Sequence, residues 1–334
     1  MAASLVGKAS MAAHICVAET GGALGPSSAS HREDLALNSV ASHPKEIAGY
    51  RVLARIGEGA ASELFAVQDP KTKQVWALKH VVKSSERDQR FLDQVENEYA
   101  VGAKLDHESI RGVQRIVRHR KRFKVHSISL VMELVDGYSL DQREPKSVLE
   151  VVRVFERVVA GLVHMHSRGL VHADLKPSNI LVTDQDHVKI IDLGQGCKIG
   201  TVKKRIQGTP GYMAPEQAHR QEITPKTDIY NLGATMYWVL VRDVIPTALP
   251  PKDENSFYSG ALDAEQVEPP VPPHEKNSAI HPLLSRQVLD MVKLEPDQRP
   301  ESMEVVANRL ALIGDVLEKP EGEQVVLEDE ETQF

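Results

Sequence analysis

A short polar segment in the middle of the chain, residues 172–179, carries the side chains best suited to chemistry. Asp174 follows an apolar stretch, and its carboxylate can accept the proton of a substrate hydroxyl or orient that hydroxyl for in-line attack. Lys176 lies close by in the sequence and can neutralise the charge that builds on a transferring phosphoryl group. This segment therefore predicts phosphoryl transfer to a hydroxyl.

Two side chains near this segment offer hard oxygen ligands for a metal ion. Asn179 supplies an amide oxygen, and Asp192 supplies a carboxylate at the end of a predicted strand. Mg²⁺ binds few protein oxygens and keeps phosphate oxygens of its substrate in its shell, so one Asp and one Asn suffice. Each acid alone could equally cap a loop, and only the ordered set favours a magnesium–nucleotide site.

The first part of the folded region has features of a nucleotide phosphate site. Gly57 and Gly59 follow a predicted strand, and glycines let backbone N–H groups approach phosphate oxygens closely. Two glycines more often make a plain turn, and a lone strand lysine is more often a solvated charge. Lys79, at the end of the next strand, would nevertheless pair with the α- and β-phosphates, and Glu98 on the following predicted helix would fix it.

The elements that must position these residues follow from the apolar patterns. Apolar and polar residues alternate over residues 50–56 and 74–82, which is typical of strands. Apolar residues then recur at helical spacing over residues 86–104. Two more strands flank a basic run and end in the apolar residues 128–132. The later patterns are helical, over residues 148–167, 227–241, 283–294 and 303–317. Strands first and helices second predict an α+β protein with a small β-rich lobe and a larger, mainly helical lobe.

Composition divides the 334 residues into three zones. Residues 1–48 are rich in Ala, Ser and Gly, and we expect a disordered leader there. The folded region is expected over residues 49–317, with the small lobe over 49–135 and the large lobe over 136–317. Residues 318–334 are acidic and are expected to form a solvated tail.

Charge and apolar content exclude several classes of protein. The net charge of −7 gives no global drive toward nucleic acid, and we expect no nucleic-acid partner. No stretch approaches the roughly 18 consecutive apolar residues of a membrane helix, and His14 interrupts the short apolar run near the amino terminus. Two cysteines, Cys16 and Cys197, are too few for a disulfide framework. A cytoplasmic protein without a membrane span is expected.

The motifs together resemble a eukaryotic-like (Hanks-type) protein kinase domain, from residue 50 to about residue 317. The resemblance implies the bilobal kinase fold, ATP as phosphate donor with Mg²⁺ (or Mn²⁺ in its place), and a protein substrate. It implies catalytic roles for Asp174, Lys176, Lys79 and Glu98, and metal ligation by Asn179 and Asp192. It implies ATP binding by Ile56, Gly57, Glu58, Gly59, Ala60, Ala61, Ser62, Leu64, Ala77, Lys79, Met132, Glu133 and Val135, with residues 133–135 as the hinge whose backbone groups bind adenine.

Further motif residues fall in the segment that follows. In the family the glutamate of Ala214-Pro215-Glu216 pairs with a late arginine, here Arg299, and Asp228 resembles the helix aspartate that braces the catalytic loop. Lys176 and Thr209 stand where the serine/threonine branch carries them. The string over residues 208–217 is similar to bacterial members in particular. The resemblance thus implies a bacterial serine/threonine protein kinase active in signalling.

The sequence departs from the family pattern at several positions. Ser62 replaces a third glycine, Ala61 an aromatic residue, Leu64 a valine and Leu193 the phenylalanine of Asp-Phe-Gly. Ala173 replaces the arginine that binds a phosphate on the activation loop, and alanine cannot bind one. We therefore expect activity that does not depend strongly on phosphorylation of residues 192–216.

Three alternatives stay open. The departures invite a pseudokinase, a scaffold that binds nucleotide without turnover, although the residues of the transfer chemistry are all present. A small-molecule phosphotransferase of related fold is disfavoured by the peptide-binding segment over residues 208–217. A basic run is favoured as a solvated hairpin over a docking patch for an acidic partner or tail; it comprises Arg115, Arg118, Arg120, Lys121, Arg122 and Lys124.

Overall fold

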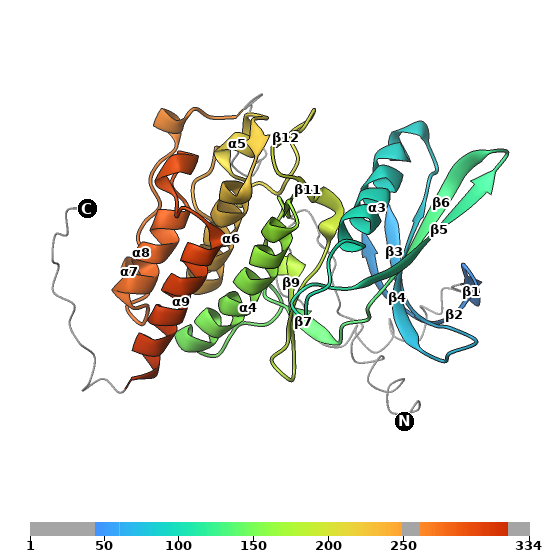
Figure 1. Cartoon of the computed structure of the whole chain (residues 1–334), viewed down its shortest axis with the longest axis horizontal. Coiled ribbons are helices and arrows are strands. Elements are labelled where there is room, and N and C mark those ends of the chain that lie inside the picture. The colour runs from blue at the N-terminus through green and yellow to red at the C-terminus, as the bar shows by residue number, and fades with distance from the viewer. Residues whose placement is uncertain (1–43, 60, 249–260, 320–334) are drawn as a thin grey trace, which may run out of the picture. The chain divides into compact units, whose positions relative to one another are not determined.

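The computed structural model describes residues 44–59, 61–248 and 261–319, and these form two compact units (Figure 1). Unit 1 holds the described residues up to Ala103 together with Gly112–Gly137. Unit 2 holds Lys104–Arg111 and the described residues from Tyr138 onward. Unit 1 is mainly a sheet and unit 2 is mainly helical, so the predicted order of strands first and helices second is confirmed.

Unit 1 is a six-stranded antiparallel sheet with one α-helix packed on it (Figure 1). The strand order is β1-β2-β3-β4-β6-β5, with β1 at Glu46–Ile47, β2 at Tyr50–Gly59, β3 at Ser62–Gln68, β4 at Val75–Val82, β5 at Val113–Lys121 and β6 at Lys124–Met132. A short 3₁₀ turn, η2 (Glu86–Asp88), leads into helix α3 (Gln89–Gly102). The helix buries Leu92 and Val95 against apolar residues of β4 and β6, because these positions share one helical face.

The structure divides the chain differently from the prediction at two places. Strand β1 pairs with β2 and buries Ile47 in a core cluster, so residues 44–48 are folded rather than part of a disordered leader. Residues 104–111 belong to unit 2, because Ile110 bridges to Ile190 and the N–H of Arg111 donates to the Ile190 carbonyl at 3.0 Å. The rest of the predicted leader, residues 1–43, and the tail after Lys319 lie outside the described residues.

Unit 2 is built around one buried helix, α6 (Pro225–Val241). Almost every side chain from Thr227 to Leu240 is buried, as expected for a helix that is covered on all sides. Thr224 caps its first turn and Pro225 occupies the first helical position, a placement where a missing N–H costs nothing. Three long helices contact it: α4 (Val148–Ser167), α8 (Pro282–Met291) and α9 (Met303–Glu318).

Short elements of unit 2 connect these helices. The strands are β7 (Gly137–Ser139), β8 (Leu170–Val171), β9 (Ile180–Thr183), β10 (Val188–Ile190), β11 (Cys197–Lys198), β12 (Thr201–Val202) and β13 (Glu222–Ile223). The short helices are η3 (Pro177–Asn179), η4 (Leu193–Gln195), α5 (Pro215–Ala218), η5 (Ala264–Gln266), α7 (Pro273–Lys276) and η6 (Pro296–Gln298). Within the described ranges, no helix combines the length and the apolar character needed to cross a membrane.

Candidate active site

In unit 1, Lys79 and Glu98 form a close ion pair. Lys79 lies on β4 between Leu64 of β3 and Leu130 of β6, and its Nζ is 2.7 Å from Glu98 Oε2 on α3. The Glu98 side chain is 1% exposed and that of Lys79 is 18% exposed. A carboxylate this deeply buried requires a charged partner, so the pair holds α3 and β4 in a fixed relation. The predicted pairing of these two residues is therefore present in the structure.

The glycine-containing loop is the tip of a tight hairpin. Gly57 pairs with Leu64 and Gly59 with Ser62, so β2 turns directly into β3. A methyl group on Gly59 would lie 2.8 Å from Ser62 Oγ, so a side chain there would require the Ser62 hydroxyl to rotate away. Ala60, a predicted ATP-binding residue, lies outside the described residues.

Several residues predicted to surround adenine share one apolar cluster. Ala77 of β4 pairs directly with Met132 of β6, and both are buried. Leu64 packs against the same cluster, which is why leucine is accommodated in place of valine. Ile56 on β2 and Val135 after β6 are also buried.

One backbone group of the predicted hinge is already engaged. The N–H of Glu133 donates to the Gly112 carbonyl at 2.8 Å, and the Gly112 N–H donates to Glu133 Oε2 at 3.0 Å. The Glu133 N–H is therefore bonded within unit 1, and the proposal that hinge backbone groups bind adenine applies to the other N–H and C=O groups of residues 133–135. This contact depends on a turn 21 residues earlier in the chain, which no local pattern indicates.

In unit 2, Asp174, Lys176 and Thr209 form a hydrogen-bonded group. Thr209 Oγ1 donates to Asp174 Oδ1 at 2.9 Å and accepts from Lys176 Nζ at 3.1 Å. Lys176 Nζ lies 3.9 Å from the other carboxylate oxygen of Asp174. The Thr209 hydroxyl thus lies between a carboxylate and an ammonium group, which shows that Asp174 can accept a hydrogen bond from an aliphatic hydroxyl beside Lys176.

Asp228 fixes the backbone of this loop. Its fully buried carboxylate accepts hydrogen bonds from the N–H groups of His172 and Ala173 at 2.9 and 2.8 Å, and it contacts His166 Nε2 at 2.9 Å. Ala173 has φ +60°, a left-handed conformation that non-glycine residues seldom adopt. The hydrogen bonds that these N–H groups donate to Asp228 compensate this conformation, so the predicted bracing contact is present.

The β9–β10 hairpin brings the two predicted metal ligands to one end. Ile180 pairs with Ile190, and the N–H of Ile191 donates to the Asn179 carbonyl at 2.9 Å. Asn179 and Asp192 are consequently neighbours, and Asn179 Nδ2 donates to the Asp174 carbonyl at 2.9 Å. The register of the β9–β10 pair, rather than proximity in the sequence, therefore brings Asn179 and Asp192 together.

The charges at this end of the hairpin fit a divalent cation. Burial raises the pKa of the Asp174 carboxyl above its ordinary value; the Lys176 ammonium lowers it, and the negative charge of Asp192 raises it again. The Asp192 carboxylate and the Asn179 amide supply the hard oxygen donors that Mg²⁺ prefers, and a cation there would offset the repulsion between Asp192 and Asp174. The residues present therefore fit the predicted ion.

Glu216 and Arg299 form the second buried ion pair. Arg299 Nη1 and Nη2 donate to Glu216 Oε1 and Oε2 at 2.8 and 2.9 Å, the parallel geometry that arginine makes with a carboxylate. The remaining guanidinium hydrogens go to the carbonyls of Lys226, Lys293 and Leu294, so all five donors are used. The predicted pairing is present, and it ties α5 to α6 and to the turn before η6.

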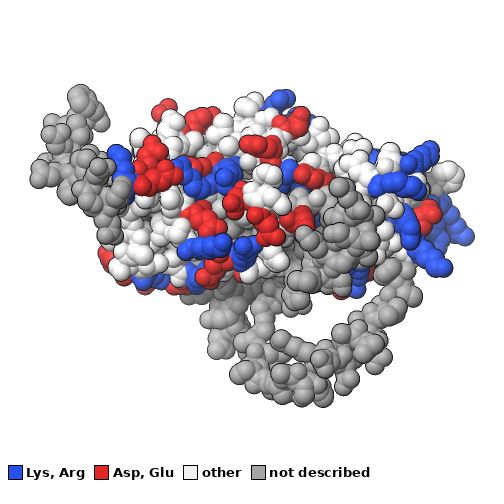
Figure 2. Space-filling view, turned by 90° about the horizontal axis from the view of Figure 1, so that it is seen from below, with Lys and Arg blue, Asp and Glu red and all other residues white. Residues whose placement is uncertain are grey.

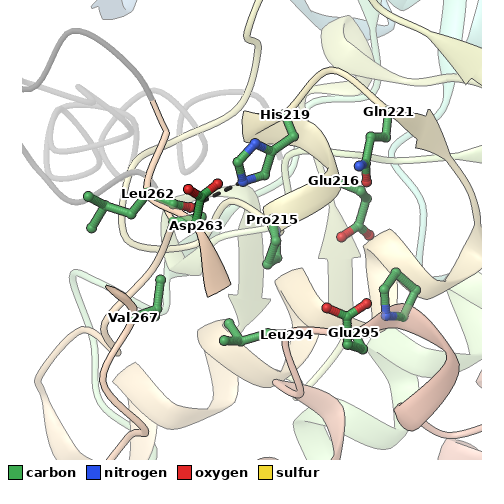
Figure 3. Close-up of a pocket in the computed structure, with 11 residues that line it drawn as sticks. Pro215, Glu216, His219, Gln221, Leu262, Asp263, Val267, Leu294 and Glu295 are labelled. Atoms are coloured by element: carbon green, nitrogen blue, oxygen red, sulfur yellow. Dashed lines mark hydrogen bonds between the residues drawn. The ribbon is translucent and has the colours of Figure 1, made fainter. Parts of the chain in front are cut away.

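A cavity of about 250 Å³ lies beside this ion pair (Figure 3). Figure 3 shows His219 directed toward the Leu262 carbonyl, to which its Nε2 is hydrogen-bonded at 3.1 Å. The residues that line the cavity are both polar and apolar, and they come from α5, from the segment that begins at Leu262 and from the turn at Leu294. Asp174, Lys176 and Thr209 are not among the lining residues, so this cavity is not part of the hydroxyl-binding group.

Gln217 is a functional candidate that sequence reasoning missed. Its Nε2 donates to the Ala173 carbonyl at 2.7 Å, and its Oε1 accepts from the N–H of Ala214 and from Asn231 Nδ2, both at 3.0 Å. Gln217 therefore links the catalytic loop, the activation segment and α6. In the sequence, only its position at the end of the motif over residues 208–217 marks Gln217, and no sequence pattern predicts the hydrogen bonds of its side chain.

A sequence model of the protein kinase domain matches residues 50–310, more than half of the chain. The chain belongs to the protein kinase family. The β-rich unit 1 and the helical unit 2 are accordingly the small and large lobes of the kinase fold, and the predicted bilobal α+β class is confirmed.

Comparison with individual kinases gives similar proteins in bacteria and animals. The serine/threonine-protein kinase pkn3 of Myxococcus xanthus is 29% identical over 79% of this kinase and 50% of its own length. PrkC of Bacillus subtilis is 26% identical over 86% of this kinase and 44% of its own length. The inactive serine/threonine-protein kinase PLK5 of Mus musculus is 32% identical over 66% of this kinase and 37% of its own length. The matches span half or less of the length of these relatives.

Proposed function

We propose that this kinase transfers the γ-phosphate of Mg-ATP to a serine or threonine hydroxyl of a protein, as a non-specific serine/threonine protein kinase of bacterial signalling. The observation that carries the proposal is the placement of Asp174 beside Lys176, where the Asp174 carboxylate accepts a hydrogen bond from the Thr209 hydroxyl at 2.9 Å and Lys176 Nζ lies 3.1 Å from the same hydroxyl. A cytoplasmic location is part of the same proposal.

Each residue has one role in the proposed reaction. The substrate hydroxyl oxygen bonds to the γ-phosphorus while the bond to the bridging oxygen of ADP breaks, and Asp174 receives the hydroxyl proton. Lys176 neutralises charge on the transferring phosphoryl group. Lys79, held by Glu98, would pair with the α- and β-phosphates. Asn179 and Asp192 would hold Mg²⁺, which neutralises the phosphate oxygens when bound.

A kinase assay on the purified full chain tests this proposal. Wild type with γ-labelled Mg-ATP and a mixture of generic protein acceptors is expected to label serine and threonine. Asp174→Ala is expected to lose at least a thousandfold in rate while retaining nucleotide, because Lys79 and Glu98 lie on other elements. Full label transfer by Asp174→Ala would refute the assignment of Asp174.

The same assay decides between the proposal and a pseudokinase. That alternative is favoured by one observation, since a relative of 32% identity is named inactive. Nucleotide binding by wild type without any label transfer would make the chain a nucleotide-binding scaffold. Transfer to added small metabolites in preference to proteins would make it a small-molecule phosphotransferase.

We further propose that activity does not depend strongly on phosphorylation of the activation segment. Ala173 is fully buried and offers no cation for a phosphate. Lys203 instead reaches back within the segment, where its Nζ donates to the Gln195 carbonyl at 2.6 Å. Phosphatase treatment is expected to change the rate less than threefold; a hundredfold loss would overturn this point.

A further inference from the structure

The turn that joins β5 and β6 has a backbone conformation that its residues do not favour. Lys121 pairs with Lys124, which leaves Arg122 and Phe123 as a two-residue loop with φ values of +48° and +71°. Such loops favour Asn-Gly, because both central residues must adopt positive φ. Bulky residues held in this conformation are a reason to look for a function that requires their side chains.

The side chains at this turn form an exposed apolar and basic surface. Phe123 is 99% exposed, although phenylalanine ordinarily contributes to a core. Lys121, Arg122 and Lys124 surround it and are exposed, and among the described residues no carboxylate lies within ion-pair distance of these three. The earlier basic residues of the run differ, since Arg118 is paired with Glu96 and Arg115 lies over the Tyr50 ring.

A groove of about 740 Å³ lies beside the turn. One wall is the turn and the start of β6, and the other is the segment from Lys83 to Glu86; the lining residues are Lys83, Ser84, Ser85, Glu86, Lys121, Arg122, Lys124, Val125 and His126. The N–H of Lys83 donates to the His126 carbonyl at 2.9 Å, which fixes the two walls together. The single carboxylate in the lining, Glu86, is bonded to Lys83 at 2.9 Å. The groove is thus preformed and positively charged.

Figure 2 shows Lys and Arg side chains gathered at the right-hand end of the view, the end where Figure 1 places the strands of unit 1. We define the basic groove as the lining residues of the preceding paragraph together with Phe123. Its chemistry fits an extended acidic peptide that also carries a short apolar stretch, because the cations would neutralise carboxylates while Phe123 contacts the apolar side chains.

The chain itself contains such a peptide. Residues 320–334 include Glu321, Glu323, Glu328, Asp329, Glu330 and Glu331 and contain no Lys or Arg. The apolar run Val325-Val326-Leu327 lies between the two acidic groups. Fifteen extended residues span up to about 50 Å, which is ample to cross the groove. We propose that residues 320–334 of this chain bind the basic groove of unit 1.

Other anionic partners fit the molecule less well. An anionic membrane or a nucleic acid presents many negative charges at once, and the six acids of residues 320–334, attached to the same chain, would be repelled by such a surface. A covalently attached acidic segment is present at high effective concentration whenever its attachment allows it to reach a groove. The proposal does not depend on phosphoryl transfer.

Zero-length carbodiimide coupling on the full chain tests the proposal. This reagent joins a carboxylate to a lysine amine only where the two are in contact. At about 20 mM salt we expect Lys121 or Lys124 to couple to a carboxylate of residues 321–331, with mass spectrometry locating the bond. Near 1 M salt the yield should fall at least tenfold, because the screening length shrinks to about 3 Å.

Lys71 and Lys73, at the turn between β3 and β4, are the matched control. They are exposed lysines on another turn of the same sheet, and their coupling to the acidic segment should be at least tenfold weaker. Arg122→Glu retains both reactive lysines and should reduce their coupling at least tenfold. Replacement of all six acids of residues 320–334 by the amides should abolish it. Unchanged melting temperatures of these variants would confirm that the fold is intact.

Several outcomes would overturn the proposal. They are equal coupling at Lys71 and Lys73, coupling of Lys121 and Lys124 to another segment only, and unchanged coupling in Arg122→Glu. The full chain could also bind phosphatidylserine vesicles. If that binding depends on Phe123 and is unchanged in the six-amide variant, the occupant of the groove is a membrane instead. Coupled products that migrate as monomers or as dimers both support the proposal, and they distinguish binding within one chain from binding to a second copy.

Discussion

Glu98 shows how burial makes a single charge consequential. Its carboxylate lies 2.7 Å from Lys79 Nζ, and it is almost fully buried. Glu98→Gln keeps the size of the side chain but removes the charge that holds the lysine. Loss of one partner of a buried ion pair usually costs about 3–5 kcal/mol, so we expect kcat/KM for ATP to fall at least roughly tenfold.

Glu96, two positions earlier on the same helix, is the control for this prediction. Its side chain is partly exposed and pairs with Arg118 across to β5, with Arg118 Nε 2.6 Å from Glu96 Oε1. Exposed pairs contribute about 0–1 kcal/mol, so Glu96→Gln should change kcat/KM less than threefold. Steady-state kinetics on both variants make the comparison, and equal losses would contradict a specific role for Glu98.

Asp228 acts at the scale of an element, because its carboxylate holds the backbone of the catalytic loop. Burial raises the pKa of Asp228, but hydrogen bonding to His166 and the backbone donor Ala173 outweigh it and hold this pKa below the ordinary 3.8. A carboxyl with a lowered folded pKa stabilises the protein above its unfolded pKa, and that contribution is lost as the pH falls through the folded pKa. Its contribution should therefore be complete above about pH 5.

Asp228→Asn should lower the free energy of unfolding by about 2–4 kcal/mol at pH 7, because an amide cannot accept all the bonds of the carboxylate. The difference from wild type should shrink below pH 4. Urea unfolding at pH 7, 5, 4 and 3 measures it. Asp243→Asn, at an exposed pair with Lys276, should cost less than about 1 kcal/mol at any of these pH values. A difference for Asp228→Asn that stays constant to pH 3 would refute the linkage.

For the turn of the β5–β6 hairpin, we expect a substitution that increases the stability of the protein. Phe123 has φ +71° and is almost wholly exposed, so Phe123→Gly removes strain and loses no buried contact. We expect about 1 kcal/mol of stabilisation, or a melting temperature about 2 °C higher by calorimetry. The exposed Leu312, in helix α9, is the contrast, since Leu312→Gly should destabilise by about 1 kcal/mol. Destabilisation by Phe123→Gly would show that the turn is not strained.

The sequence predicts elements better than it predicts the contacts among them. Periodicity alone locates α4 and α9 to within one residue, because one apolar face is repeated over many turns. Strand β1 escapes prediction, since a two-residue strand has no periodicity and exists only because β2 offers it an edge. The engaged N–H of Glu133 escapes for a similar reason, because its acceptor comes from a distant turn.

At the scale of the whole molecule, the kinase motifs predict both units and two buried pairs of a cation with a carboxylate. Lys79–Glu98 and Glu216–Arg299 are recoverable because each of these residues stands at a position that the family motifs mark, and their burial explains why each charge has a partner. Neutral polar residues give no such signal. Gln217 joins three segments of unit 2. The sequence does not predict this, because a glutamine that follows a motif can be either exposed or buried.

Gln217→Glu tests whether this neutral residue holds unit 2 together. The variant keeps the acceptor for Ala214 and Asn231 but loses the Nε2 donor to the Ala173 carbonyl, and it buries a negative charge. We expect a loss of about 2–4 kcal/mol in the free energy of unfolding and a lower kcat with an almost unchanged KM for ATP.

Gln287 provides the comparison that separates this role from burial alone. Its side chain is as buried as that of Gln217, but its Nε2 has no hydrogen-bond partner within the described part of the chain, and its Oε1 accepts from Arg309. Gln287→Glu therefore loses no bond and gains a charge beside an arginine, so it should cost less than about 1 kcal/mol. Urea unfolding and phosphoryl-transfer rates on both variants decide the matter. Similar losses would mean that any buried charge is harmful, whereas a loss confined to Gln217→Glu would establish its bond to the catalytic loop as the cause.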